Sequence, residues 1–150
     1  MSAPAIREAG QFGVEVTRMQ ITWKYVKPLK ANSLFDQLSG DIVVKLPDML
    51  MACLKKNNGG RPSSKSFDTT MAKGYVFSSL YSFNDDDVNS VSDMLDDLIS
   101  VHLFPVGIES GGNSICYHLG KGKMVLLNHE TGKTEDVLLG SNEMLFSSLL

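Results

Sequence analysis

Three histidines and a run of aspartates are the residues whose types could support catalysis or metal binding. Catalysis requires a nucleophile with a base, a pair of carboxylates or a set of metal ligands. His102 ends an apolar helical pattern, His118 lies in an alternating strand pattern, and His129 stands beside Glu130 in a turn-like segment. Because a histidine next to a glutamate is common in solvated turns, we predict no catalytic residue, no metal site and no cofactor.

Two short runs look superficially like ligand loops. Gly120-Lys121-Gly122-Lys123 lacks the full spacing and the following helix of a phosphate loop, so a hairpin turn is the better interpretation. Asp85-Asp86-Asp87 lacks the alternating acids and the later glutamate of a calcium loop. We interpret it as the solvated start of a helix, with a protein-binding acidic face as the alternative.

The charges are distributed unevenly along the chain. Residues 1–81 carry a net charge of +5 and residues 82–150 a net charge of −8. Between Ser82 and Glu109 there are seven acids and no lysine or arginine. Such asymmetry is informative about partners rather than about fold. We therefore predict a partner-binding surface with these candidate residues: Asp85, Asp86, Asp87, Asp93, Asp96, Asp97, Glu109 and Asn113.

The composition is that of an ordinary soluble domain. The 150 residues are 43% hydrophobic and 21% charged, and no apolar run reaches the roughly 18 residues of a membrane helix. Residues 1–13 have no apolar signal region and should be loose. Cys53 and Cys116 lie in apolar runs, which favours buried free thiols in a reducing compartment. We expect one domain over residues 1–150, in the cytoplasm, without membrane contact.

A central hairpin is predicted from Phe104 to Tyr117. Apolar residues alternate with small or polar ones on both sides of Ser110-Gly111-Gly112-Asn113, as expected for two strands with one buried face. The Gly-Gly-Asn turn supplies residues that tolerate positive φ.

Four helices are predicted from caps and apolar spacing. Asn32 or Ser33 should cap a short helix that Gly40 ends, and Pro47 should open a second one that Asn57-Asn58-Gly59-Gly60 closes. The longest should start at Asn84, with an apolar stripe and with Asp93, Asp96 and Asp97 facing water. The stripe consists of Val88, Val91, Leu95, Leu98 and His102. A terminal helix should follow Ser141 or Asn142, with inward residues Met144, Leu145, Leu149 and Leu150.

Further strands are predicted from alternation. Ile21, Trp23 and Tyr25 suggest one within residues 14–25, where a helix over 14–19 is the alternative. Others are expected over 75–83, 124–127 and 137–139, and residues 61–70 and 128–133 should be loops or turns. The order of elements indicates an α+β fold with a mainly antiparallel sheet of about five or six strands flanked by about four helices.

Several of these pieces together resemble the SUKH superfamily. Its members include immunity proteins of bacterial polymorphic toxin systems and fungal regulators of cell-wall synthesis. The matching residues run from about Leu34 to Leu150, and the motif positions are Pro47, Gly59, Gly60, Pro105, Gly107, Gly111 and Gly112. Asn113, the strand Ile115-Cys116-Tyr117, Lys123-Met124-Val125 and Asn128-His129-Glu130 extend the match. Glu109 stands one step earlier than the acidic residue usual in the family, and the turn carries two glycines instead of one.

The resemblance implies a compact domain that works by binding another protein. The expected function is that of an immunity protein, not an enzyme, that neutralises a cognate toxin such as a nuclease or a contact-dependent inhibition toxin. An acidic face could then mimic the polyanion that a nuclease binds, with no direct contact to nucleic acid. A non-enzymatic regulatory or scaffold protein of the same fold is the alternative, and an uncharacterised hydrolase is a third reading.

Overall fold

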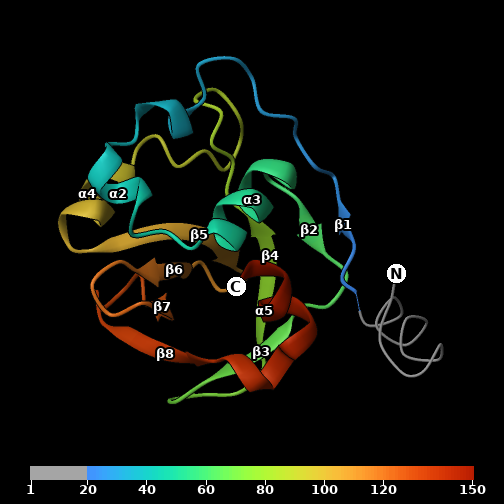
Figure 1. Cartoon of the computed structure of the whole chain (residues 1–150). Helices are drawn as coiled ribbons and strands as arrows, with labels where there is room; N and C mark the ends of the chain where they lie inside the picture. The colour runs from blue at the N-terminus through green and yellow to red at the C-terminus, as the bar shows by residue number, and fades with distance from the viewer. Residues whose placement is uncertain (1–19) are drawn as a thin grey trace, which may run out of the picture.

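The computed structural model describes residues 20–150. Within them, six antiparallel strands close into a barrel in the order β3-β4-β5-β6-β7-β8 (Figure 1). These strands are β3 (Ser66–Thr69), β4 (Tyr75–Leu80), β5 (Leu103–Glu109), β6 (Ser114–His118), β7 (Lys123–Leu127) and β8 (Thr134–Leu138). A separate ladder pairs β1 (Trp23–Lys24) with β2 (Arg61–Pro62). The prediction of an α+β fold with a mainly antiparallel sheet is confirmed. The expectations for residues 1–13 and 14–19 lie outside the described residues.

Short helices cover the barrel. They are η1 (Leu34–Gln37), α2 (Gly40–Val43), α3 (Asp48–Lys56), α4 (Leu95–Ser100), η2 (Leu139–Asn142) and α5 (Glu143–Leu149). Helix α3 packs against α5, and α4 packs against β5. Figure 1 shows α4 on the opposite side of the structure from β1 and β2.

The predicted hairpin is present as β5 and β6, paired from Leu103–His118 to Ile108–Ser114. The expectation of one buried face was wrong, because both faces are covered. Phe104 and Ile115 belong to the main core, while Leu103 and Cys116 form a second small cluster beneath Leu98 of α4. The helix thus buries the face that alternation alone assigned to solvent.

The prediction that the longest helix starts at Asn84 was also wrong. Residues 84–94 form turns, and α4 begins only at Leu95. Val88 is 74% exposed and Asn89 has a left-handed φ of 62°. The Asp87 carboxylate accepts hydrogen bonds from the Ser82 hydroxyl and the Asn84 amide. Such local side-chain bonds compete with helical ones, which explains why the acidic run turns rather than coils.

Two smaller expectations fail for similar local reasons. Residues 61–70 were predicted as a loop but contain β2 and β3, and Phe67 in β3 is only 1% exposed. A single inward apolar residue among polar neighbours gives too weak an alternation to reveal a strand. Gly40 begins α2 instead of ending a helix, since η1 already stops at Gln37.

The predictions of a helix after Pro47 and of a terminal helix after Asn142 are confirmed by α3 and α5. Pro47 takes the position just before α3, and Leu50, Cys53 and Leu54 face the core. Gly59, with φ of +69°, follows the helix as the glycine motif requires. In α5 the Asn142 side chain accepts the Leu145 N–H at 3.1 Å. The inward residues predicted for α5 omit Phe146, which is 2% exposed, and include Met144 and Leu150, which are half-buried.

Substitution of Gly112 by valine should weaken the fold by about 1–3 kcal/mol, because a β-branched residue is strained at its φ of +92°. Urea denaturation would measure the change. Gly140 is the control, since its φ is not left-handed and an added Cβ would meet nothing within 4 Å. Equal stability of Gly112→Val and Gly140→Val would contradict the turn geometry.

Candidate protein-binding surface

The eight candidate residues fall into three groups in the structure. Asp93, Asp96 and Asp97 lie on or beside α4, and Asp85 to Asp87 lie in the preceding loop. Glu109 and Asn113 flank the β5–β6 turn. The seven residues of β5 separate α4 from this turn along the chain, and the two ends of the strand lie about 20 Å apart. The acids of the sequence run therefore belong to three separate segments.

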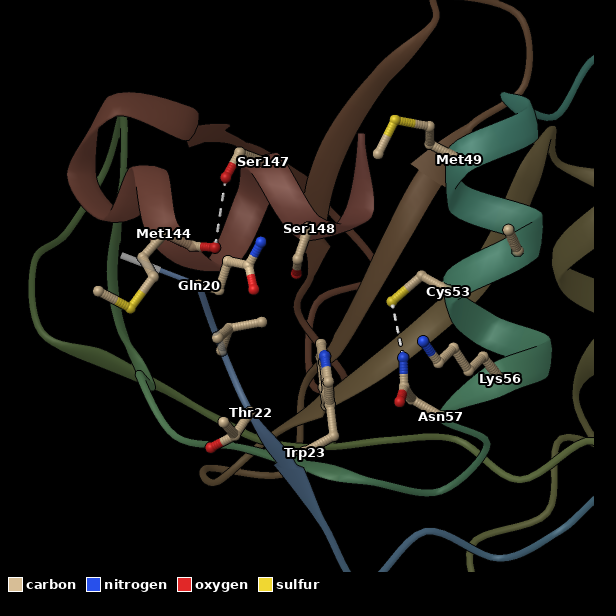
Figure 2. Close-up of a pocket in the computed structure, with 12 residues that line it drawn as sticks. Gln20, Thr22, Trp23, Met49, Cys53, Lys56, Asn57, Met144, Ser147 and Ser148 are labelled. Carbon is tan, nitrogen blue, oxygen red and sulfur yellow. Dashed lines mark hydrogen bonds between the residues drawn. The ribbon is translucent and has the colours of Figure 1, made fainter. Parts of the chain in front are cut away.

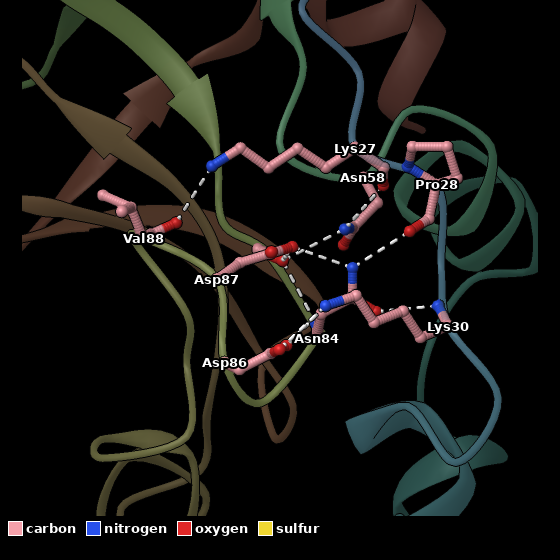
Figure 3. A network of polar contacts seen from close by, with 9 residues as sticks. Lys27, Pro28, Lys30, Asn58, Asn84, Asp86, Asp87 and Val88 are labelled. Atoms are coloured by element: carbon pink, nitrogen blue, oxygen red, sulfur yellow. Dashed lines mark hydrogen bonds and ion pairs between the residues drawn. The ribbon is translucent and has the colours of Figure 1, made fainter.

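The loop group is largely engaged in structural contacts (Figure 3). The Lys30 ammonium lies 2.8 Å from the Asp86 carboxylate, and Asp87 accepts from the Ser82 hydroxyl at 2.7 Å and from Asn84 Nδ2 at 2.8 Å. Asp85 is exposed and its carboxylate makes no hydrogen bond within residues 20–150. Within residues 20–150, Asp85 is the one member of this group whose carboxylate is left unengaged.

The contacts shift the acidity of both bonded aspartates. Hydrogen bonds from Asn84 and Ser82 lower the pKa of Asp87 below its ordinary value. The hydrogen bond from Lys30 lowers the pKa of Asp86 and in turn raises the pKa of Lys30. Both carboxylates therefore remain ionised to lower pH than a free aspartate does.

Glu109 serves the turn instead of the surface. It is 5% exposed, and its two carboxylate oxygens accept the Gly111 N–H and the Asn113 side-chain amide, each at 2.8 Å. The Asn113 Oδ1 accepts the His129 backbone N–H at 3.0 Å. A partner could not reach the Glu109 carboxylate without opening this turn. This burial argues against the close partner contact predicted for Glu109.

The α4 group has the properties of an accessible surface. Asp93, Asp96 and Asp97 are exposed, and Leu95 between them is buried, as the sequence predicted. None of the three carboxylates forms an ion pair or a side-chain hydrogen bond within residues 20–150. Val101, just past the helix, is 56% exposed. Unpaired acids beside an exposed apolar side chain are suited to contact with another protein.

His118 and His129 make ordinary structural hydrogen bonds. His118 Nδ1 accepts the backbone N–H groups of Gly120 and Lys121 at 3.1 and 3.0 Å. Its pKa is lowered, first by burial and then by Lys121. Gly120, Lys121 and Gly122 lie in the turn between β6 and β7, as predicted, and Lys123 begins β7. Within residues 20–150 no three histidines, cysteines or acids are grouped so as to hold a metal ion.

An open groove of about 830 Å³ lies between β1, α3 and α5 (Figure 2). Trp23, Met49, Cys53 and Met144 contribute its apolar lining, and among the described residues that line it Lys56 alone is charged. The Cys53 thiol accepts a hydrogen bond from Asn57 Nδ2 at 3.6 Å, and burial raises its pKa. The raised pKa disfavours the reactive thiolate, and among residues 20–150 the lining includes no histidine or carboxylate to activate it.

The motif positions are structural. Gly107 faces the Phe77 ring so closely that an added Cβ would overlap it, and Pro105 stands beside a register shift between β5 and β6. Gly60 lies where an added Cβ would come within 2.8 Å of the Asn57 carbonyl oxygen. Sequence reasoning placed Asn58 only in the run that closes the helix. The residue is fully buried, and its side chain bonds two other segments, at Lys27 and at Ser82 and Phe83.

Comparison with known proteins gives one finding. The model of the SUKH_6 family, described as SMI1-KNR4 cell-wall, matches residues 34–138. No curated protein and no solved structure matches the chain. Among the described residues, no helix has the length and apolar character that crossing a membrane requires.

Replacement of Asp87 by asparagine should lower the free energy of unfolding at neutral pH. It should also make that free energy vary less with pH in the acidic range. The folded-state pKa of Asp87 lies below the unfolded value of about 3.9, so its stabilising effect is present above that pH. The effect is lost as the pH falls through the folded-state pKa. We expect the stability difference between wild type and Asp87→Asn to shrink below about pH 4.

Urea denaturation across this pH range would measure the difference. Asp85→Asn is the matched control, because Asp85 is exposed and makes no side-chain hydrogen bond within residues 20–150. A gap between wild type and Asp87→Asn that stays constant with pH would contradict the assigned bonds.

Proposed function

The chain belongs to the SMI1-KNR4 family of the SUKH superfamily, and from that premise we propose that it is an immunity protein that binds and neutralises a cognate protein toxin. The family includes immunity and regulatory proteins, so membership alone leaves both functions open. The observation that carries the proposal is the exposed acidic group on α4: Asp93, Asp96 and Asp97, unpaired within residues 20–150.

Charge of this kind acts mainly on the rate of association. Nucleases present basic surfaces to phosphates, and an acidic face complements such a surface. Electrostatic complementarity steers the encounter of two proteins and contributes less to how long the complex lasts. The neighbouring Val101, exposed by 56%, adds apolar area that can be buried once the two proteins have met.

Neutralisation by binding needs no chemistry from the chain. In the groove, the Ser148 hydroxyl donates to the Leu145 carbonyl at 2.7 Å and the Cys53 thiol has a raised pKa. His129 is bonded to Asn113, and His118 uses Nδ1 to hold a turn. These groups are arranged as structural partners, which supports a non-enzymatic mechanism.

A regulatory or scaffold role is the second candidate, because the matching family is described by its cell-wall members. The two functions differ in the partner that they require. An immunity protein is paired with a toxin, which is commonly encoded beside it, whereas a regulator binds a protein that is not toxic when expressed alone.

The proposal predicts rescue of growth. The product of the neighbouring gene should arrest growth when expressed alone, and co-expression of this chain should restore it. Purified wild-type protein should bind that product with saturable heat release. A neighbour that is harmless, or one that binds without rescue, would favour the regulatory role.

The triple variant Asp93→Asn, Asp96→Asn, Asp97→Asn should associate with the toxin more slowly at low salt. The difference from wild type should shrink at high salt, because screening acts over about 10 Å at 0.1 M. Stopped-flow mixing would measure the rates. The control changes three exposed acids elsewhere, Asp48→Asn, Glu130→Gln and Glu143→Gln. Equal rates for the two triple variants would exclude the α4 acids as the contact.

A second variant tests the absence of chemistry. Alanine at His118, His129 and Glu130 together should leave protection intact, apart from lower stability through the lost turn bonds of His118. Growth rescue is measured alongside thermal unfolding. A folded triple variant that fails to protect would reveal a functional site at these residues and contradict the prediction.

A further inference from the structure

The short β1–β2 ladder places two cations side by side. Lys24 and Arg61 are direct partners in the antiparallel register, and both are exposed. Like charges directly opposite each other on a ladder are destabilising. Within residues 20–150 neither side chain forms an ion pair with a carboxylate that would relieve the repulsion.

Tyr25, the residue after Lys24, has an unfavourable backbone conformation. Its φ is +59°, in the left-handed region that bulky residues rarely adopt, and its side chain is 72% exposed. Two of the other non-glycine residues with positive φ are Asn32 and Asn89, which tolerate it. The hydroxyl of Tyr25 makes no hydrogen bond within residues 20–150. Strain of this kind is typically retained at binding sites.

The Arg61 guanidinium lies over the Tyr25 ring, 5.2 Å from its centroid. A guanidinium stacked on an aromatic ring is attracted by the ring face and loses part of its freedom. Its N–H groups remain available for a planar, bidentate pairing with a carboxylate. Lys24 lies beside it as a second cation.

We propose that Lys24, Tyr25 and Arg61 form a second binding surface, for an acidic peptide segment of a protein partner. It lies on the opposite side of the structure from α4 (Figure 1). Arg61 pairs with one carboxylate, Lys24 meets a neighbouring one, and the exposed ring of Tyr25 packs against an apolar side chain of the same segment.

The charges favour an acidic peptide over nucleic acid. Nucleic-acid affinity comes from several phosphate contacts along a long polyanion. This surface offers only the two cations of Lys24 and Arg61 for such contacts. The whole chain carries a net charge of −3, which repels an extended polyanion. A short acidic segment gains the two local ion pairs and experiences little of that repulsion.

This surface is independent of the proposed immunity function. Its residues and its ladder are separate from α4, and neutralising the α4 acids should not weaken it. A failure to bind a toxin would therefore not contradict the acidic-peptide site. A failure to bind the acidic peptide would likewise not contradict the proposed immunity function.

A fluorescein-labelled hexaglutamate peptide is the probe, added to the full chain and followed by anisotropy and by backbone amide shifts. We expect saturable binding at low salt, with shifts centred on Lys24, Tyr25 and Arg61. The double variant Lys24→Gln, Arg61→Gln should weaken binding about tenfold or more, as expected for loss of charge-assisted bonds. The control Lys45→Gln, Lys73→Gln makes the same change in charge at exposed positions elsewhere and should bind like wild type.

Tyr25→Gly separates a binding role from a structural one. Glycine is unstrained at this φ, so the melting temperature should stay the same or rise while hexaglutamate binding weakens. A melting temperature lowered by several degrees would assign the ring to the fold and overturn the proposal.

Two other outcomes would overturn it. One is equal hexaglutamate binding by the two double variants, which would mean that the peptide is attracted equally to any exposed lysine or arginine. The other is tighter binding of a short oligothymidylate than of hexaglutamate, lost in the Lys24→Gln, Arg61→Gln variant, which would make the surface a nucleic-acid site.

Discussion

The fold depends on the hydrogen bonds of a single buried side chain, that of Asn58. Its Oδ1 accepts the Phe83 N–H at 2.8 Å, and its Nδ2 donates to the Lys27 carbonyl at 3.0 Å and to the Ser82 hydroxyl at 3.1 Å. The residue is fully buried. Loss of the amide would leave several polar groups without partners, each at a cost of about 1–3 kcal/mol. One side chain thus joins the segment before η1, the end of α3 and the segment after β4.

The aromatic core is oriented by the same bonds. With its N–H held by Asn58 and its carbonyl accepting the Leu34 N–H, Phe83 is fixed between two other rings. Its ring stacks on Phe35 at 4.0 Å and on Phe104 of β5 at 5.6 Å between centroids. Because Phe83 is fixed, residues 84–94 begin from a defined position. For this reason α4 has a defined position against β5, although the segment that precedes it consists of turns.

The sequence could predict those parts of the fold that local patterns determine. Leu50, Cys53 and Leu54 identify α3, and the alternation around Gly112 identifies the β5–β6 hairpin. It could not predict β3, where Phe67 is one inward residue among polar ones, because the strand exists through pairing with β4 and β8. Nor could it predict the role of Glu109, whose partners Gly111 and Asn113 follow it closely but bind it only when the turn has formed.

The same limit explains which acids could be assigned to the candidate surface. Composition assigned one role to all seven acids between Ser82 and Glu109, whereas the structure gives them different ones. Asp86 and Asp87 hold the loop, and Glu109 holds a turn. Their charges are matched by a cation or by N–H and O–H donors, and so contribute less to the field outside the protein. The acids at α4, which are unpaired within residues 20–150, therefore contribute more to the potential outside the protein than Asp86, Asp87 and Glu109 do.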